Sequence, residues 1–209
     1  MQDLQTGSLW SQISGEAIQG PLKGEWLALF HSSFTTFAQF KELYPEGKLL
    51  EKPPKEEHGS SYGDYYADPE KLGIFGRADQ FERLKGKEKV YGLRLDDREV
   101  AVVMSKLKEE RFIVLQDSST ATQIVIGFDP VGETAYAFSV TGDFVSRADK
   151  LRHQGGLVVY GKNEVAWEVG TGRVIHYPPD AQLTVEPLPL ISAYWFAWVS
   201  FFADTELIK

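Results

Sequence analysis

The sequence of 209 residues contains no cysteine. This absence excludes disulfide bonds, thiolate catalysis, and zinc or iron–sulfur sites that cysteine would hold. The sequence also has no run of about 18 apolar residues, so we expect no membrane-spanning helix. The N-terminus lacks the charged and apolar regions of a signal peptide. The protein is therefore expected in the cytoplasm, or outside it if a natural leader is missing.

Positive charge and histidine are also scarce. The chain has 22 Lys and Arg against 30 Asp and Glu, a formal net charge of -8, and such a surface repels the phosphates of nucleic acids. None of the 4 histidines has a second histidine at metal-ligand spacing. No phosphate-binding loop or nucleophile elbow occurs. We therefore expect no nucleic-acid partner, no metal and no cofactor.

The composition is that of an ordinary soluble globular protein. The chain is 43% hydrophobic and 25% charged, and it is long enough to bury one core. An alternation of period two in EVAVVM (99–104) and TAYAFSV (134–140) is typical of half-buried strands. Short β-like runs punctuated by glycine fill residues 8–30. The sequence predicts a single domain (1–209) of a β-rich α+β class, whose antiparallel twisted sheets form a sandwich or a partly open barrel.

Two short aromatic helices are expected beside the strands. Ser33 or Thr35 is a suitable N-cap for the first helix, and Ser192 for the second. In the second helix Trp195 and Trp198 share one face. The first helix has an apolar face at helical spacing, formed by Phe37, Phe40, Leu43 and Tyr44.

The two ends of the chain carry similar segments, LWSQISGEAIQGP and AWEVGTGRVIHYP. Trp10 of the first matches Trp167 of the second, and Gly15 matches Gly172. Each segment is followed by a β-like run and then by an aromatic helix. Because the matches continue in order through a hairpin and a helix, the sequence predicts an internal repeat.

The stretches TGSLWSQISGEAIQGPLKG, SSYGDYYADPE and AYWFAWVSFFADTEL resemble the prokaryotic family DUF3179, a domain of unknown function. The resemblance covers essentially the whole chain, and it implies that a full member holds two copies of one β-rich unit. Residues 1–51 would then be the tail of a first unit whose greater part is missing. Residues 52–86 would be a connection that wraps over the surface, and residues 87–209 the second unit. The resemblance implies an architecture and no activity.

The chain departs from this family in one respect that bears on chemistry. The usual first unit carries a Cys-Pro-Leu-Cys-like segment on a strand. The corresponding strand of the second unit has Asp129-Pro130 in this sequence. A cysteine-based family function therefore does not carry over to this chain.

Three side chains at predicted strand ends are candidate catalytic residues: Asp117, Asp129 and His176. If Asp117 and Asp129 projected to one end of a sheet, they would form an acid–base pair. The alternative is that both carboxylates accept hydrogen bonds from backbone N–H groups in turns. His176 would then be a partly exposed strand residue.

The segment YGDYYADPE holds the candidate binding residues Asp64, Tyr65 and Asp68. Its carboxylates invite a calcium site, but they lack the alternating acids of a calcium loop. Alternatively, Asp68 and the proline that follows it begin a turn or a short helix.

We interpret the chain as a binding or structural module with no self-contained active site. The alternative is a hydrolase-like or metal-assisted enzyme that uses the Asp and His side chains at strand ends. Exposed strand edges pair readily with other chains. Residues 8–30 are therefore expected either to join the sheet of the second unit or to pair across a homodimer. The identity of any small-molecule ligand is left open.

Overall fold

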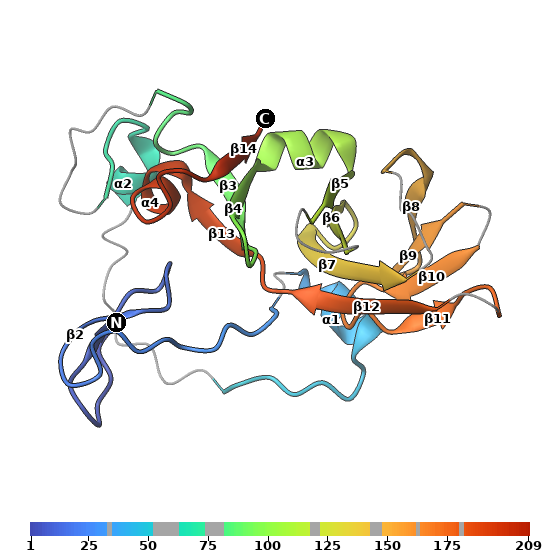
Figure 1. Cartoon of the computed structure of the whole chain (residues 1–209), viewed down its shortest axis with the longest axis horizontal. Coiled ribbons are helices and arrows are strands. Elements are labelled where there is room, and N and C mark those ends of the chain that lie inside the picture. Colours follow the sequence, from blue (N-terminus) through green and yellow to red (C-terminus); the bar gives the residue numbers. More distant parts are fainter. Residues whose placement is uncertain are drawn as a thin grey trace.

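The computed structural model describes residues 1–32, 35–51, 63–73, 82–117, 122–142, 148–161, 164–179 and 182–209. In these residues the strands form three four-stranded sheets and one two-stranded hairpin (Figure 1). Sheet I has the order β13 (Ile191–Tyr194), β3 (Lys89–Arg94), β4 (Glu99–Val103) and β14 (Glu206–Ile208). Sheet II has the order β12 (Leu183–Leu188), β7 (Thr134–Gly142), β6 (Gln123–Asp129) and β5 (Phe112–Gln116). Sheet III has the order β11 (Val174–His176), β10 (Val165–Glu168), β9 (Leu157–Tyr160) and β8 (Leu151–Gln154).

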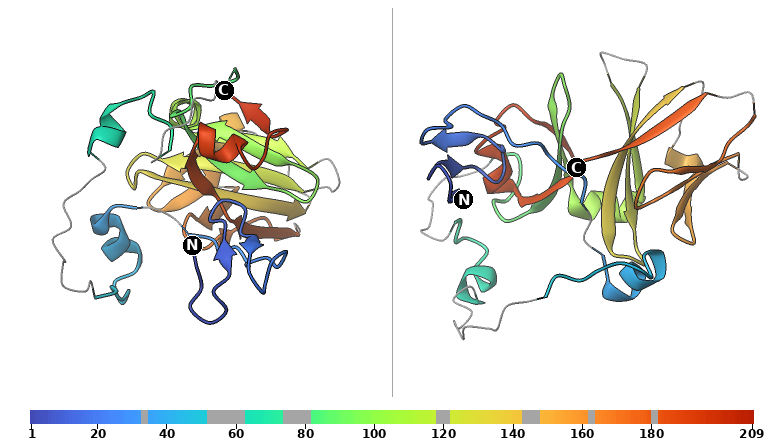
Figure 2. Two further views of the ribbon diagram at one scale, coloured as in Figure 1. Left: turned by 90° about the vertical axis from the view of Figure 1, so that its left-hand side faces the viewer. Right: turned by 90° about the horizontal axis from the view of Figure 1, so that it is seen from below.

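The remaining two strands, β1 (Leu9–Trp10) and β2 (Ala17–Gln19), form the N-terminal hairpin. The described strand pairs are antiparallel, except that β14 pairs with β4 in parallel. Figures 1 and 2 show the layers in order, from the N-terminal hairpin through sheets I and II to sheet III.

Sheet II is the middle layer, and its side chains alternate between two hydrophobic cores. On β6, Ile124 and Ile126 pack into the core shared with sheet I, whereas Val125 packs into the core shared with sheet III. All seven residues of β6 are buried. Its nearly continuous apolar sequence, QIVIGFD, is typical of a strand that is covered on both faces.

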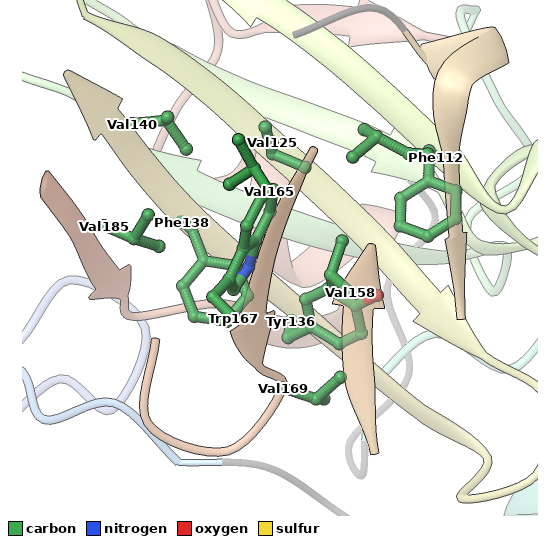
Figure 3. Packing of buried hydrophobic residues seen from close by; sticks show 11 residues of the cluster. Phe112, Val125, Tyr136, Phe138, Val140, Val158, Val165, Trp167, Val169 and Val185 are labelled. Carbon is green, nitrogen blue, oxygen red and sulfur yellow. The ribbon is translucent and has the colours of Figure 1, made fainter. Parts of the chain in front are cut away.

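Trp167 on β10 is the largest side chain in the core between sheets II and III (Figure 3). It is fully buried, and its ring meets Phe138 of β7 edge to face, with the centroids 6.1 Å apart and the planes at 82°. Such a geometry is favoured by the quadrupoles of the two rings. Valines from β6, β7, β9 and β12 lie in the same core.

A third core covers the outer face of sheet I. Helix α4 (Trp195–Val199) places Trp195 and Trp198 on Val90 and Ala101, and both Trp rings are buried. Ile13 from the N-terminal hairpin packs against the same cluster. The shared face expected for the two tryptophans is therefore observed.

The expected start of that helix is wrong. Ser192 lies in β13 opposite Tyr91 of β3, and the N-cap residue of α4 is Tyr194. Residues 191–194 pair with sheet I, so they satisfy their backbone groups in a ladder rather than in a helical turn.

Helix α1 (Phe37–Leu43) also differs from expectation. Its N-cap is Thr36, whose hydroxyl accepts a hydrogen bond from the backbone N–H of Gln39 at 3.3 Å. Thr35 is therefore not the cap, and Ser33 lies outside the described residues. The expected apolar face is largely exposed, because Phe37, Leu43 and Tyr44 all face solvent. Gln39 is the buried residue of this helix.

Two further helices were not expected from the sequence: α2 (Gly63–Ala67) and α3 (Met104–Glu110). Helix α3 follows β4 directly and ends at Arg111, which has a φ of 69°. A positive φ is uncommon for a residue other than glycine, and the backbone N–H of Arg111 still donates to the carbonyl of Leu107.

The predicted fold class is confirmed. The chain is β-rich, its sheets are mostly antiparallel and packed in layers, and they are not closed into a barrel. The single-domain boundaries and the division into two units stay predictions.

Gly92 on β3 provides a test of the packing on sheet I. A Cβ atom at this position would lie 2.1 Å from the buried Trp198 ring. We expect Gly92→Ala to lower the free energy of unfolding by about 1–3 kcal/mol, the usual cost of overpacking, as measured by urea denaturation. Gly63→Ala is the control, because no atom lies within 4 Å of its Cβ position. Equal stability of the two variants would contradict this packing.

Candidate functional site

The two carboxylates considered as an acid–base pair lie at opposite ends of one strand pair. Gln116 at the end of β5 is opposite Gln123 at the start of β6, and Asp129 ends β6. Asp117 therefore lies beside the start of β6. At a rise of about 3.3 Å per residue, roughly 20 Å separates it from Asp129. The structure does not bring these two residues together.

Asp129 is buried in a polar network. One carboxylate oxygen accepts a hydrogen bond from the backbone N–H of Val131 at 2.9 Å, and the other accepts one from the side-chain amide of Gln39 at 3.0 Å. The first contact closes the turn between β6 and β7, as the turn alternative predicts. The second tethers helix α1 to that turn, a role that the sequence did not indicate.

A second polar pair, formed by the buried Tyr136 and the half-buried His153, lies near Asp129. The hydroxyl of Tyr136 on β7 is hydrogen-bonded to Nε2 of His153 on β8, and the His153 ring stacks on Phe112 with centroids 4.7 Å apart. Burial raises the pKa of Tyr136 well above its usual value, with a smaller contribution from Asp129. Burial also lowers the pKa of His153. Both side chains are therefore neutral at neutral pH.

Two buried polar atoms beside Asp129 have no hydrogen-bond partner among the described residues: Oε1 of Gln39 and Oγ1 of Thr134. Thr134 is directly opposite Asp129 in the β6–β7 ladder. The three side chains are all at least nine-tenths buried. This polar cluster is closed to solvent, which suits a structural role better than the turnover of a substrate.

His176 lies apart from both carboxylates. It is exposed on β11 at the edge of sheet III, opposite Ala166, whereas Asp117 and Asp129 belong to the β5–β6 pair of sheet II. The three candidate catalytic residues therefore do not form one constellation.

The candidate binding residues lie in and after α2. The ammonium group of Lys87 donates to the backbone carbonyls of Tyr65 and Asp68 and lies 3.9 Å from the centroid of the Tyr65 ring. Asp68 also accepts a hydrogen bond from the backbone N–H of Glu70 at 2.9 Å, as expected of a turn residue. The side chain of Asp64 lies outside the described part of the chain.

The described residues hold neither a cluster of metal-ligating side chains nor a membrane-spanning helix. No group of three or more His, Asp or Glu side chains in them is placed to hold a metal ion. None of their helices has the length and hydropathy needed to cross a membrane.

The N-terminal hairpin and the β10–β11 hairpin have the same register. Trp10 pairs with Ala17, and Trp167 pairs with Val174, at a constant offset of 157 residues. In each hairpin the register shifts at the position just before the tryptophan. A bulge at a matched position is a specific feature of backbone geometry.

The turns of the two hairpins also match. Gly15 donates its N–H to the carbonyl of Ser11, and Gly172 donates to the carbonyl of Glu168, both at 2.9 Å. The φ angles of the two glycines are 78° and 72°. Both turns thus require the left-handed conformation that glycine adopts without strain.

A third strand follows the same offset. Gln2 forms a bridge with Leu9, as Val159 pairs with Ala166. The correspondence therefore covers the β9 side of the hairpin as well as the hairpin itself.

Arg94 of β3 fixes the N-terminal hairpin to sheet I. Its guanidinium donates a 2.6 Å hydrogen bond to the carbonyl of Ser14. The same group lies 4.9 Å from the ring centroid of Trp26 and 5.5 Å from that of Phe202. Charge-assisted hydrogen bonds and contacts between cations and aromatic rings are both attractive.

Residues 25–30, which we call the open run, leave the hairpin as an extended segment (Figure 1). One side of the run is bonded, because Ala17 donates to the carbonyl of Glu25 and Leu27 donates to the carbonyl of Gly15, both at 2.9 Å. All six of its residues are exposed. Phe30 is 84% exposed and Trp26 54%.

A family model described as "Protein of unknown function (DUF3179)" matches residues 1–205. The chain belongs to the DUF3179 family. The resemblance seen in the sequence is thus confirmed. No curated protein and no solved structure matches this DUF3179 chain.

Several residues that shape this DUF3179 chain were missed by sequence analysis. Gln39, His153 and Arg94 each contact a residue that is distant in sequence: Asp129, Tyr136 and Ser14. A lone polar residue on a strand or a short helix carries no periodic signal that would mark such a contact.

The half-buried His153 gives this DUF3179 chain a predicted pH dependence. Its pKa is lowered on folding, so the unfolded chain binds the proton more readily and stability is lost as the pH falls below about 6.5. We expect the thermal midpoint of wild type to fall more steeply between neutral and mildly acidic pH than that of His153→Gln. His176→Gln, at an exposed histidine, should keep the wild-type slope. Identical slopes for wild type and His153→Gln would contradict the prediction.

Proposed function

We propose that the chain is a binding module that associates with a second copy through the open run. The observation that carries this proposal is an extended segment of exposed residues whose backbone is bonded on one side only. Backbone groups of alternate residues in an extended segment point to opposite sides. Trp26, Ala28 and Phe30 therefore direct theirs away from the N-terminal hairpin, and they form no backbone hydrogen bond among the described residues.

The matched hairpins support this proposal. A side chain on Gly15 would approach the carbonyl oxygen of Leu27, and one on Gly172 would approach that of Val185. Leu27 in the open run thus occupies the position that Val185 has in β12. In sheet II, β12 pairs with β7 along its whole length, with Val185 opposite Val140. The open run therefore corresponds to β12, which is paired with β7. Among the described residues, no strand pairs with the outer edge of the open run.

The same correspondences support the predicted repeat. We infer that residues 1–51 are the tail of one unit and residues 87–209 are a second unit, joined by residues 52–86. The matching register, bulge and turn glycines of the two hairpins favour this division.

The chemistry of the open run suits association with another strand. Its sequence, EWLALF, carries a single charge, and Trp26, Leu27, Leu29 and Phe30 are all exposed. Natural edge strands that avoid association usually carry lysine, proline or an inward-facing charge. The open run has none of these protections.

A second copy is the occupant that the sequence of the open run fits. Antiparallel pairing of the outward-facing residues about a two-fold axis places Trp26 opposite Phe30, Leu27 opposite Leu29, and Ala28 opposite its own copy. No like charges face each other in this register, and apolar cross-strand pairs stabilise a ladder. A two-fold interface also satisfies the edges of both copies at once.

The enzymatic alternative has less support. A hydrolase-like or metal-assisted reaction that uses Asp117, Asp129 and His176 needs these side chains within reach of one substrate, and they lie on separate parts of the fold. Asp129 is 4% exposed, with both oxygens engaged. The net charge of -8 favours partners other than nucleic acid.

Analytical ultracentrifugation over about a hundredfold range of concentration tests the proposal. We expect wild type to move from monomer to dimer, and Ala28→Pro to raise the dissociation constant at least about tenfold, because proline removes an outward N–H group. Leu50→Pro is the control, since Leu50 is fully exposed and outside the strands. A wild type that stays monomeric, or an Ala28→Pro variant that dimerises like wild type, would refute the proposal.

A further inference from the structure

A cleft of about 290 Å³ lies between sheet I and the start of β7. Its walls come from β3, the start of α3, the turn before β7 with the start of that strand, β13 with the residue before it, and Ser32, so five separate segments meet there. The main lining residues are Lys89, Tyr91, Met104, Glu133, Leu190 and Ser192. Concave sites with apolar walls and a few converging polar groups are the usual form of small-molecule sites.

Two opposite charges line this cleft without neutralising each other. Lys89 belongs to β3 of sheet I, and Glu133 belongs to the turn that leads into β7 of sheet II. Within the part of the chain that the structure describes, neither side chain forms a hydrogen bond or an ion pair. The cleft therefore presents one cationic and one anionic group to a ligand.

The position of Glu133 is fixed by an unusual backbone conformation. Its φ is 49°, one of two left-handed non-glycine residues among the described residues. The buried Asp129 holds the preceding turn through Val131, and the Gln39 side chain packs against Gly132. A left-handed conformation of a residue other than glycine destabilises the fold. In this turn the residue that adopts it is Glu133, which carries the charge.

The other residues that line the cleft have apolar side chains or side chains with a hydroxyl group. Burial raises the pKa of Tyr91, so its hydroxyl keeps its proton at neutral pH. Ser192 is the cross-strand neighbour of Tyr91. Met104 and Leu190 supply apolar surface to the cleft.

We infer that the cleft binds a small zwitterion with an apolar side chain, of the size of a single free α-amino acid. The ligand carboxylate pairs with the ammonium group of Lys89, and its ammonium group pairs with the carboxylate of Glu133. Its side chain lies on Tyr91, Met104 and Leu190. A volume of about 290 Å³ is at the lower end of the usual range for ligand pockets, which favours one residue over a longer peptide. No residue of the open run lines the cleft, although the lining residue Ser32 follows Phe30 by two positions. The inference concerns a ligand and so goes beyond the proposed association.

Isothermal titration calorimetry with L-leucine, L-methionine and L-phenylalanine tests the inference. We expect at least one of these amino acids to bind to wild type, and to bind at least about tenfold less tightly when its carboxylate is amidated or its amine is acetylated. Failure of all three amino acids to bind would overturn the inference.

Two charge variants assign the two ends of the ligand. Lys89→Met should weaken binding of the free amino acid at least about tenfold and leave binding of its amide unchanged. Glu133→Gln should weaken binding of the free amino acid and leave binding of its N-acetyl derivative unchanged. Lys48→Met, at an exposed lysine outside the cleft, should bind like wild type.

Both charged residues are exposed, so the variants should retain the wild-type circular dichroism and sedimentation behaviour. Wild-type affinity in Lys89→Met or Glu133→Gln would overturn the proposed orientation and the site. Loss of dimerisation in Ala28→Pro with intact amino-acid binding would support two independent sites.

Discussion

The contact between Arg94 and the N-terminal hairpin is the interaction on which the proposed association depends. The hairpin has two short strands, and such a unit is marginally stable in water. The guanidinium of Arg94 holds the carbonyl of Ser14 and lies beside the ring of Trp26, the second residue of the open run. Ile13 adds an apolar contact with the core on sheet I. The position of the open run follows from where these contacts place the hairpin.

The layered sheets separate the closed parts of the molecule from the open ones. Sheet II is covered on both faces, and the polar cluster of Asp129, Gln39 and Thr134 is buried between elements. The charged cleft and the open run both lie at the margins of the layers, where backbone edges and charged side chains meet solvent. The same cluster nevertheless supports the cleft, because Asp129 holds the turn that carries Glu133.

The sequence predicts those features that rest on local patterns. Alternation identifies strands such as β4 and β7, and the matched Trp10 and Trp167 point to two hairpins that do have the same register. It fails where pairing between distant segments decides the outcome. Ser192 lies in a strand because β3 is its neighbour, and His153 meets Tyr136 across two sheets. No local pattern contains either contact.

Residue-resolved hydrogen exchange by NMR tests most directly whether the N-terminal hairpin is an anchored counterpart of the β10–β11 hairpin. The amides of Ser11, Gly15 and Ala17 donate backbone hydrogen bonds, so they should be protected, as should those of Glu168 and Gly172. The amide of Ala28 should exchange freely at low protein concentration and become protected as the concentration rises. Exchange of the hairpin amides at the rate of an unfolded chain would contradict the account.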